Sequence, residues 1–266
     1  MIIRLLLILN LVLFNNTFSQ EREKFINQKI IFATRENYPY TSSNPFDSGY
    51  FIELTKKALE YSNIKSEYIF VSNDQAVQLI KEGKIDAIIG ISETENDSLI
   101  MSNSAWLETS TGVYALENYV GTVSEVYHLY NKIVGFSVDL PLESKLKKIL
   151  YNHYIKKPNM FKISSGFDSI EENIKLLKDK EIDVFLEDEN VMNNYIKNSD
   201  VPIKKVGSLS EKFKIYVAFS ATDPKTQKYM KLLDSGIMIM KNSGELKEIE
   251  DNYLHNILDD IDNNLK

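Results

Sequence analysis

One order of strand-like and helix-like segments occurs twice along the chain, and this repetition constrains the fold more than any other feature. The strand-like segments are short apolar runs, whereas the helix-like segments carry apolar residues on one face, three or four positions apart. The order β-α-β-α-β predicts parallel strands with helices packed on the faces of a sheet. The first set comprises residues 29–34, 50–61, 67–72, 74–83 and 84–90, from the strand KIIFAT to the strand KIDAIIG.

The second set has the same elements in the same order. Its segments are residues 132–138, 142–155, 161–164, 169–180 and 182–188. The letters also repeat, because LIKEGKIDAIIG in the first set corresponds to LLKDKEIDVFLE in the second. We therefore predict an α/β protein with two similar βαβ lobes.

Two apolar, alternating segments outside the sets are typical of extended strands, and we expect them to cross between the lobes. They cover residues 110–121 and 212–220. The tail carries two helix-like segments, 223–241 and 244–258, and should pack back on the first lobe because it has no strands of its own. Two lobes joined by two crossing strands form a hinged cleft, a common place for a ligand. The predicted boundaries are 20–115 plus 213–266 for the first lobe and 116–212 for the second.

Residues 1–19 are typical of a cleavable signal peptide. Arg4 precedes a short apolar run, residues 5–14, and small residues at Thr17 and Ser19 fit cleavage between Ser19 and Gln20. The run is shorter than the roughly 20 residues that span a bilayer, so we favour cleavage over a membrane anchor. The chain has no cysteine, hence no disulfide and no cysteine-linked lipid. We expect a soluble protein of the periplasm.

The charge pattern argues against nucleic acid as a partner. The net charge is −7 and the lysines are scattered, so no basic patch is predicted. The histidines, His128, His153 and His255, are isolated, and no pair has metal-ligand spacing. The chain lacks a cysteine nucleophile, a G-x-S-x-G turn and a phosphate-binding glycine loop. We therefore expect no catalytic residue, no cofactor and no metal.

Several short motifs, in their order, resemble the solute-binding proteins of bacterial amino-acid uptake systems. The resemblance extends from about Lys29 to Tyr253, which is nearly all of the mature chain. The resemblance implies the type II periplasmic binding fold, of the amino-acid-binding (family 3) type, and cooperation with a membrane transporter. The motifs are YPY at 38–40, GYFIEL at 49–54, LIKEGKIDAIIG at 79–90, NSAW at 103–106, IDVFLED at 182–188 followed by Tyr195, KIYVAF at 214–219 and KNSGELKEIEDNYL at 241–254.

In that family a ligand amino acid is held at both ends of its zwitterion. The resemblance places Asp188 where the family binds the ammonium group. It places Asp97 or Ser98 where the family has an arginine for the carboxylate, and neither can donate a bidentate pair. At a second carboxylate contact, a helix start, the chain has Asp-Leu-Pro at 139–141, and proline has no N–H to donate. The weakened carboxylate grip favours an amine-bearing or neutral polar ligand.

Arg35 and two tyrosines follow the first predicted strand. Arg35 lies at the carboxyl end of that strand, where α/β sheets bind ligands. It could replace the missing carboxylate-binding arginine or form a surface ion pair. The resemblance places Tyr38 and Tyr40 beside the side chain of the ligand, and their position in a loop favours the cleft over the core.

Other candidates keep two interpretations each. Ser92 and Thr94 could bind the ligand through hydroxyl or backbone groups, or simply form a turn. Asp97 could belong to the acids of a helix start or lie partly buried in the cleft. Glu187 could contact the ligand or lie in a solvated helix start, and Trp106 could cap the pocket or pack at the hinge.

The sequence thus predicts a monomeric periplasmic solute-binding protein that captures a small polar ligand, amine-bearing or amino-acid-like, for an ABC-type permease. A sensory or orphan role, in which the bound form docks on a membrane receptor, needs the same cleft and stays open. The fold also resembles exported enzymes that dehydrate cyclohexadienyl amino-acid precursors, in which Glu187 would serve as a general acid. The absence of catalytic motifs favours binding over this enzymatic alternative.

Overall fold

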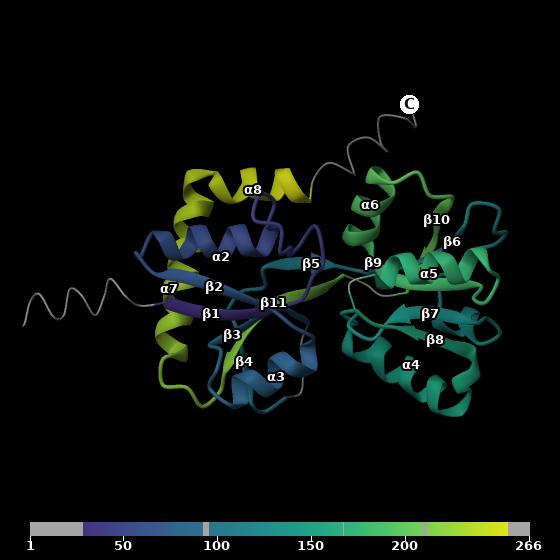
Figure 1. The fold of residues 1–266 in the computed structure, drawn as a ribbon, viewed down its shortest axis with the longest axis horizontal. Coiled ribbons are helices and arrows are strands. Elements are labelled where there is room, and N and C mark those ends of the chain that lie inside the picture. Colours follow the sequence, from purple (N-terminus) through teal and green to yellow (C-terminus); the bar gives the residue numbers. More distant parts are fainter. Residues whose placement is uncertain (1–28, 93–95, 167, 210–211, 255–266) are drawn as a thin grey trace, which may run out of the picture.

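The computed structural model describes residues 29–92, 96–166, 168–209 and 212–254, and the predicted signal peptide with its cleavage site lies outside these ranges. The chain forms two α/β lobes side by side, each built on its own sheet (Figure 1). This is the fold that the repeated order of elements predicts. Within the described ranges, no helix is both long enough and apolar enough to cross a membrane.

The sheet of the first lobe combines parallel strands with an antiparallel extension. Its strands are β1 (Lys29–Thr34), β2 (Lys65–Phe70), β3 (Ala87–Ser92), β4 (Leu99–Met101), β5 (Leu107–Thr109) and β11 (Phe213–Ser220). The order is β2-β1-β3-β11-β4, and β5 also pairs with β11. β1 is parallel to both β2 and β3, as the first set of elements predicts, whereas β11 is antiparallel to its neighbours.

Helices cover both faces of this sheet. They are α2 (Tyr50–Glu60), α3 (Asn73–Lys81), α7 (Thr226–Ser243) and α8 (Glu245–Tyr253). α2 and α3 lie on opposite faces (Figure 1), and neighbouring residues of β1, Phe32 and Ala33, accordingly belong to different core clusters. Both tail helices pack on α2, as predicted. Gly236 of α7 permits this close crossing, because a Cβ at this position would overlap the carbonyl group of Ala58.

The second lobe repeats the plan. Its strands are β6 (Thr111–Leu116), β7 (Val134–Ser137), β8 (Phe161–Ser164), β9 (Val184–Asp188) and β10 (Ile203–Ser208), in the order β10-β6-β9-β7-β8. Its helices are α4 (Ser144–Lys156), α5 (Ser169–Lys178) and α6 (Glu189–Asn198), with short 3-10 turns η1 (Val126–Leu129) and η2 (Pro158–Met160). β7, β8 and β9 are parallel. Leu186 packs with Leu146 of α4 and Phe185 packs with Ile174 of α5, so β9 is buried on both faces and needs a continuous apolar run.

The chain passes between the two sheets twice, next to the two predicted crossing segments. The first passage is at Ser110, between β5 in the first sheet and β6 in the second, and the second passage lies between β10 and β11 and includes residues outside the described ranges. β6 pairs with β9 and β10 from Thr111 onward. The chain therefore enters the second sheet before the predicted lobe boundary at residue 115. Apolar alternation predicts a strand, but it does not show with which strands that segment pairs.

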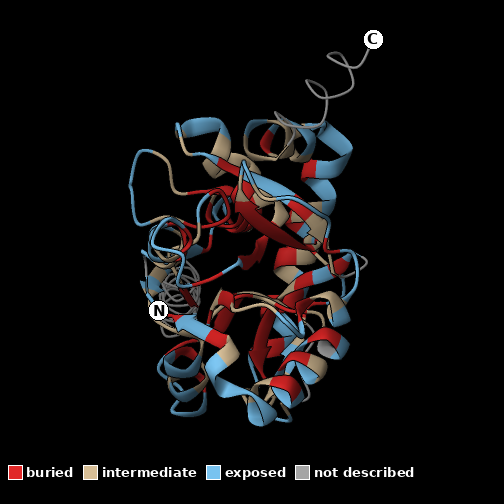
Figure 2. Cartoon of the chain, turned by 90° about the vertical axis from the view of Figure 1, so that its right-hand side faces the viewer, coloured by how far each residue is buried: buried red, intermediate tan, exposed pale blue. Residues whose placement is uncertain are grey.

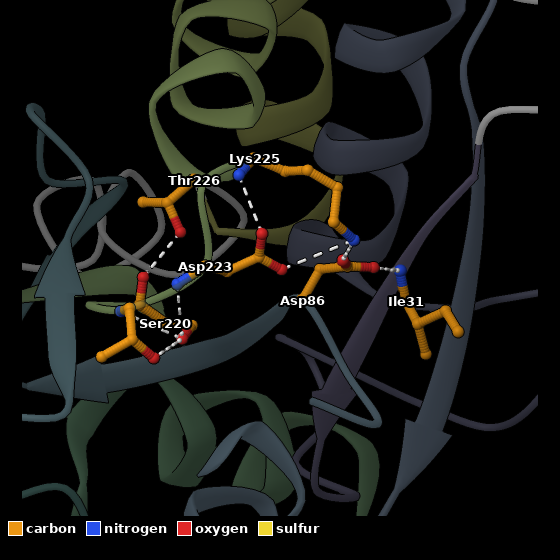
Figure 3. A network of polar contacts seen from close by, with 7 residues as sticks. Ile31, Asp86, Ser220, Asp223, Lys225 and Thr226 are labelled. Atoms are coloured by element: carbon orange, nitrogen blue, oxygen red, sulfur yellow. Dashed lines mark hydrogen bonds and ion pairs between the residues drawn. The ribbon is translucent and has the colours of Figure 1, made fainter. Parts of the chain in front are cut away.

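Buried residues gather in the strands and on the inner sides of the helices (Figure 2). A polar network holds the amino end of β3 (Figure 3). Asp86 accepts a hydrogen bond from the N–H of Ile31 at 2.8 Å and pairs with the Nζ of Lys225 at 2.9 Å, while Thr226 donates to the carbonyl of Ser220 at 2.6 Å. This network fastens the start of α7 to β1 and β11 and leaves the carboxyl ends of the strands free for a site.

Candidate functional site

The carboxyl ends of the parallel strands in both lobes open onto one cleft of about 1220 Å³. Chain that follows β1, β2 and β3 forms one wall, and chain at the ends of β7, β8 and β9 forms the other. This is the edge at which α/β sheets bind ligands. The charged residues of the lining are Arg35, Glu36, Asp74, Asp139, Lys147, Lys148, Glu171 and Glu187.

Arg35 lines the first-lobe wall directly after β1, and it is partly buried. Among the described residues, no hydrogen bond or ion pair engages its guanidinium, although the charges of Glu187, Asp139 and Asp188 act on it. Burial lowers the pKa of the Arg35 guanidinium, and these three acids oppose that effect. The surface ion pair expected as one alternative is thus not formed. An unpaired guanidinium on a cleft wall can accept an anionic group of a ligand in bidentate fashion.

Glu187 of β9 lies on the opposite wall and is 4% exposed. Its Oε1 accepts a hydrogen bond from the N–H of Asp188 at 2.8 Å. Burial raises the pKa of Glu187 to about 7, and the charge of Asp188 adds to this rise while Arg35 opposes it. A cation brought into the cleft would favour the charged carboxylate. Glu187 is therefore the nearly buried acid that this wall presents to a ligand.

Asp188, assigned by resemblance to the ammonium group, is bonded within the protein. Its Oδ1 caps α6 by accepting hydrogen bonds from the N–H groups of Asn190 at 2.9 Å and Val191 at 3.1 Å. The hydroxyl of Tyr40 donates to the same oxygen at 2.7 Å, and Nδ2 of Asn190 donates to that hydroxyl at 3.0 Å. Burial raises the pKa of Asp188 and of Tyr40. The hydrogen bond between Tyr40 and Asp188 links the two lobes, and the lining of the 1220 Å³ cleft includes neither residue. Oδ2 of Asp188 is buried without a hydrogen-bond partner among the described residues, and the ligand contact of Asp188 stays a prediction.

The helix start that the resemblance assigned to the carboxylate is closed by the protein itself. Glu143 is the N-cap of α4, and its carboxylate accepts hydrogen bonds from the N–H groups of Lys145 at 3.0 Å and Leu146 at 3.1 Å. Pro141 lies on the cleft wall and has no N–H. A ligand anion at this helix start would meet the charge of Glu143 in place of free donors. The predicted loss of a carboxylate contact at this helix start therefore has two structural causes, the missing N–H of Pro141 and the cap formed by Glu143.

Tyr38 and Ser92, two further predicted residues, line the first-lobe wall. The hydroxyl of Tyr38 donates to Asp47 at 2.9 Å. The hydroxyl of Ser92 donates to the carbonyl of Leu142 at 3.3 Å and so joins the two walls. Ser92 therefore already has a partner in the second lobe.

The other predicted residues lie elsewhere. Asp97 is exposed and outside the cleft lining, because the residues after it form β4 against β11, which also excludes the alternative of a helix start. Thr94 lies outside the described residues. Trp106 is buried in the first-lobe core, where its backbone N–H donates to the carbonyl of Ile215 at 2.9 Å and its ring packs near Phe51. It neither caps the cleft nor reaches it.

Sequence reasoning missed part of the second-lobe wall. Lys147, Lys148 and Tyr151 of α4 line the cleft, as do Glu171 and Tyr195 beyond the ends of β8 and β9. The available signal was the position of these segments directly after strand ends, which predicts a wall but not which side chains reach it. Helical spacing puts 147, 148 and 151 on one face of α4, away from buried Leu150.

Comparison with known proteins agrees with this architecture. The family model of the bacterial extracellular solute-binding proteins, family 3, matches residues 30–256. A histidine kinase sensor domain with similarity to periplasmic binding proteins has a TM-score of 0.71 and 16% identity, over 86% of this chain and 97% of that chain. An ancestral arginine-binding protein bound to arginine has a TM-score of 0.70 and 19% identity, over 86% of this chain and 99% of that chain. These two structures show the fold alone.

A sequence relative of different description is the tRNA(Met) cytidine acetate ligase of Mycoplasmopsis synoviae (strain 53). It is 25% identical over 90% of this chain and 82% of its own length. Identity at this level does not show membership of a family. The two lobes, the cleft and the match to the family model do not depend on this relative.

Proposed function

The chain belongs to the bacterial extracellular solute-binding proteins of family 3, and from this premise we propose that it captures a small polar ligand bearing an amine in the cleft between its lobes. The ligand is amine-bearing or amino-acid-like. The observation that carries the proposal is Glu187, a nearly buried carboxylate on the cleft wall that accepts one hydrogen bond from the described part of the chain. An ammonium group is the partner that satisfies such an acid best.

The rest of the cleft supports a ligand of this charge. Asp139 joins Glu187 on the second-lobe wall, and Arg35 faces them from the first lobe. A ligand that also carries a carboxylate can use Arg35 in place of the arginine that the resemblance expects after β3. An amine without a carboxylate needs only the acidic wall. Both kinds of ligand therefore share the contact with Glu187.

We propose binding without covalent chemistry, followed by delivery to an ABC-type permease after export to the periplasm. Hinged lobes and a cleft at the strand ends are what a capture protein needs. A general acid at Glu187 would also need a positioned second group for the reaction. The described cleft offers the unpaired Arg35, which serves binding directly.

Sensing is the second candidate function. It is supported by the structural likeness to a histidine kinase sensor domain, which covers 86% of the present chain. The bound form would then dock on a membrane receptor. Permease and ATPase genes beside the gene for this protein would favour uptake, and their absence would favour sensing.

The capture proposal is tested by a thermal-shift screen of amino acids, their decarboxylated amines and oligopeptides, followed by calorimetric titration. We expect at least one ammonium-bearing compound to raise the unfolding midpoint. Glu187→Gln should weaken its binding about 10- to 100-fold, because a hydrogen bond to a charged group is lost. Asp74→Asn is the matched control, since Asp74 also lines the cleft but is exposed. No midpoint shift with any compound, or equal affinity for Glu187→Gln, would contradict the proposal.

A further inference from the structure

One part of the cleft is apolar on its first-lobe side. Val71, Val77, Ile91 and Leu99 all line the cleft, and all four are partly buried against the same core cluster beneath α3. We call these four residues the apolar wall of the first lobe. In the sheet β1 lies between β2 and β3, so Arg35 at the end of β1 lies next to this wall.

The second lobe provides a facing apolar surface. Val138 lines the cleft and is 60% exposed, and Leu140 and Leu142 line it from the edge of the second-lobe core. The hydrogen bond from Ser92 to the carbonyl of Leu142 brings this segment beside Ile91 of the first wall. The two apolar surfaces therefore meet across the lobes.

The charged and apolar parts of the cleft adjoin each other. Asp139, which acts on the charge of Arg35, lies between Val138 and Leu140 in the chain. A ligand whose ammonium group reaches Glu187 therefore shares the cleft with apolar side chains such as Val138. The cleft volume of about 1220 Å³ is above the roughly 300–1,000 Å³ of pockets that bind drug-sized ligands, so it leaves room for an apolar chain beside the charged head.

We propose that the ligand is amphipathic: a charged head that bears the amine, and an aliphatic or aromatic chain that occupies the apolar part of the cleft. This inference rests on the proposed function, and it names the class of side chain that the binding site selects. A purely polar ligand would leave the apolar walls in contact with water on closure. An apolar chain removes that surface from water and gains affinity in proportion to the area covered.

The test is calorimetry with two homologous series, L-alanine, L-norvaline and L-norleucine, and the corresponding amines ethylamine, butylamine and pentylamine. Full burial of one methylene corresponds to a gain of about threefold to fourfold in affinity. We therefore expect the longest member of at least one series to bind at least about tenfold tighter than the shortest.

Val138→Ser should reduce this ratio about threefold, because it removes apolar surface at an exposed position that tolerates substitution. Val120→Ser is the matched control, since Val120 is 93% exposed and not part of the cleft lining, and it should leave the ratio unchanged. Affinity independent of chain length, or a ratio that Val138→Ser leaves intact, would overturn the inference.

A third arm of L-lysine, L-arginine, cadaverine and agmatine separates the two proposals. Tight binding of these polar compounds without any gain along the aliphatic series would refute the amphipathic ligand and leave capture intact. Failure of every compound, in these arms and in the thermal-shift screen, to bind the unmodified protein would refute both.

Discussion

Glu187 and Asp188 are neighbours in sequence, but the structure gives them different surroundings. Successive residues of a strand point to opposite faces, so only one of the two can face the cleft wall. Burial raises the pKa of both acids. Asp188 is compensated by the hydroxyl of Tyr40 and two backbone N–H groups, whereas Glu187 has one backbone N–H. Oδ2 of Asp188 is nevertheless buried without a hydrogen-bond partner among the described residues. Glu187 differs from Asp188 by its place, because it lines the cleft and Asp188 does not.

This difference predicts a pH dependence of stability. The folded protein raises the pKa of Glu187 from its ordinary value of 4.5 to about 7, so it holds the proton more tightly than the unfolded chain. The stabilising contribution is complete below about pH 4.5 and is lost as the pH rises towards 7, by at most about 3 kcal/mol. Glu187→Gln, which cannot titrate, should lose less stability over this range. Urea unfolding at several pH values checks this, and parallel pH profiles for the two proteins would contradict it.

At the scale of elements, the loop after β1 and the start of α6 are joined into one unit. The carbonyls of Pro39 and Tyr40 accept hydrogen bonds from the first residues of α2, which fixes the loop on the first lobe. Gly49, at φ 88°, begins α2 so close to Tyr40 that a Cβ would lie 2.7 Å from the backbone of Tyr40. With its backbone fixed in this way, Tyr40 of the first lobe donates its hydroxyl hydrogen bond to Asp188 of the second lobe.

The link makes α6 sensitive to its N-cap. Asp188→Ala removes two hydrogen bonds to backbone N–H groups and the acceptor of the buried Tyr40 hydroxyl, so we expect the free energy of unfolding to fall by about 2–4 kcal/mol. Asp168→Ala is the matched control, because Asp168 is the N-cap residue of α5 but makes no capping hydrogen bond and is exposed. It should cost less than about 0.5 kcal/mol. Denaturant titration of both variants measures the difference in the free energy of unfolding. Equal losses of stability would show that Asp188 contributes no more than Asp168.

At the scale of the whole molecule, two extended crossings and a few polar contacts join the lobes. The hydrogen bonds of Ser92 with Leu142 and of Tyr40 with Asp188 bridge the lobes. Apolar contacts join the lobes as well, because Val191 and Ile170 of the second lobe pack against the core cluster of the first. The cleft lies between Asp74 on the first-lobe wall and Lys147 on the second. Such an arrangement allows rotation about the crossings when a ligand adds contacts to both walls.

We expect a ligand that binds the cleft to bring Asp74 and Lys147 closer together. The chain has no cysteine, so a Cys pair introduced at these two positions can be labelled selectively with fluorophores. Energy transfer between the labels should increase on addition of a compound that the thermal-shift screen identifies. A pair at Lys56 and Asp74, both in the first lobe, should show no change. Binding without a change in transfer would mean that the lobes do not move.

Much of the fold was predictable because strands that are buried on both faces have a recognisable apolar sequence pattern. Continuous apolar runs such as VFL in β9, alternating with one-sided helices such as α3, are typical of a sheet that helices cover on both faces. The order of these segments then implies parallel strands and two lobes. The point at which the chain changes sheet was less predictable, since β6 takes its place from its partners β9 and β10.

The sequence by itself therefore determined the two lobes, the position of the cleft at the strand ends and the absence of a backbone N–H at Pro141. Only the tertiary structure decided which side chains the cleft receives. It left Arg35 unpaired on one wall and Glu187 on the other, and it turned Tyr40 and Asp188 towards each other. The physical reason is that periodicity encodes which residues are buried, whereas the partner of a buried charge depends on contacts between residues as far apart in the chain as Tyr40 and Asp188.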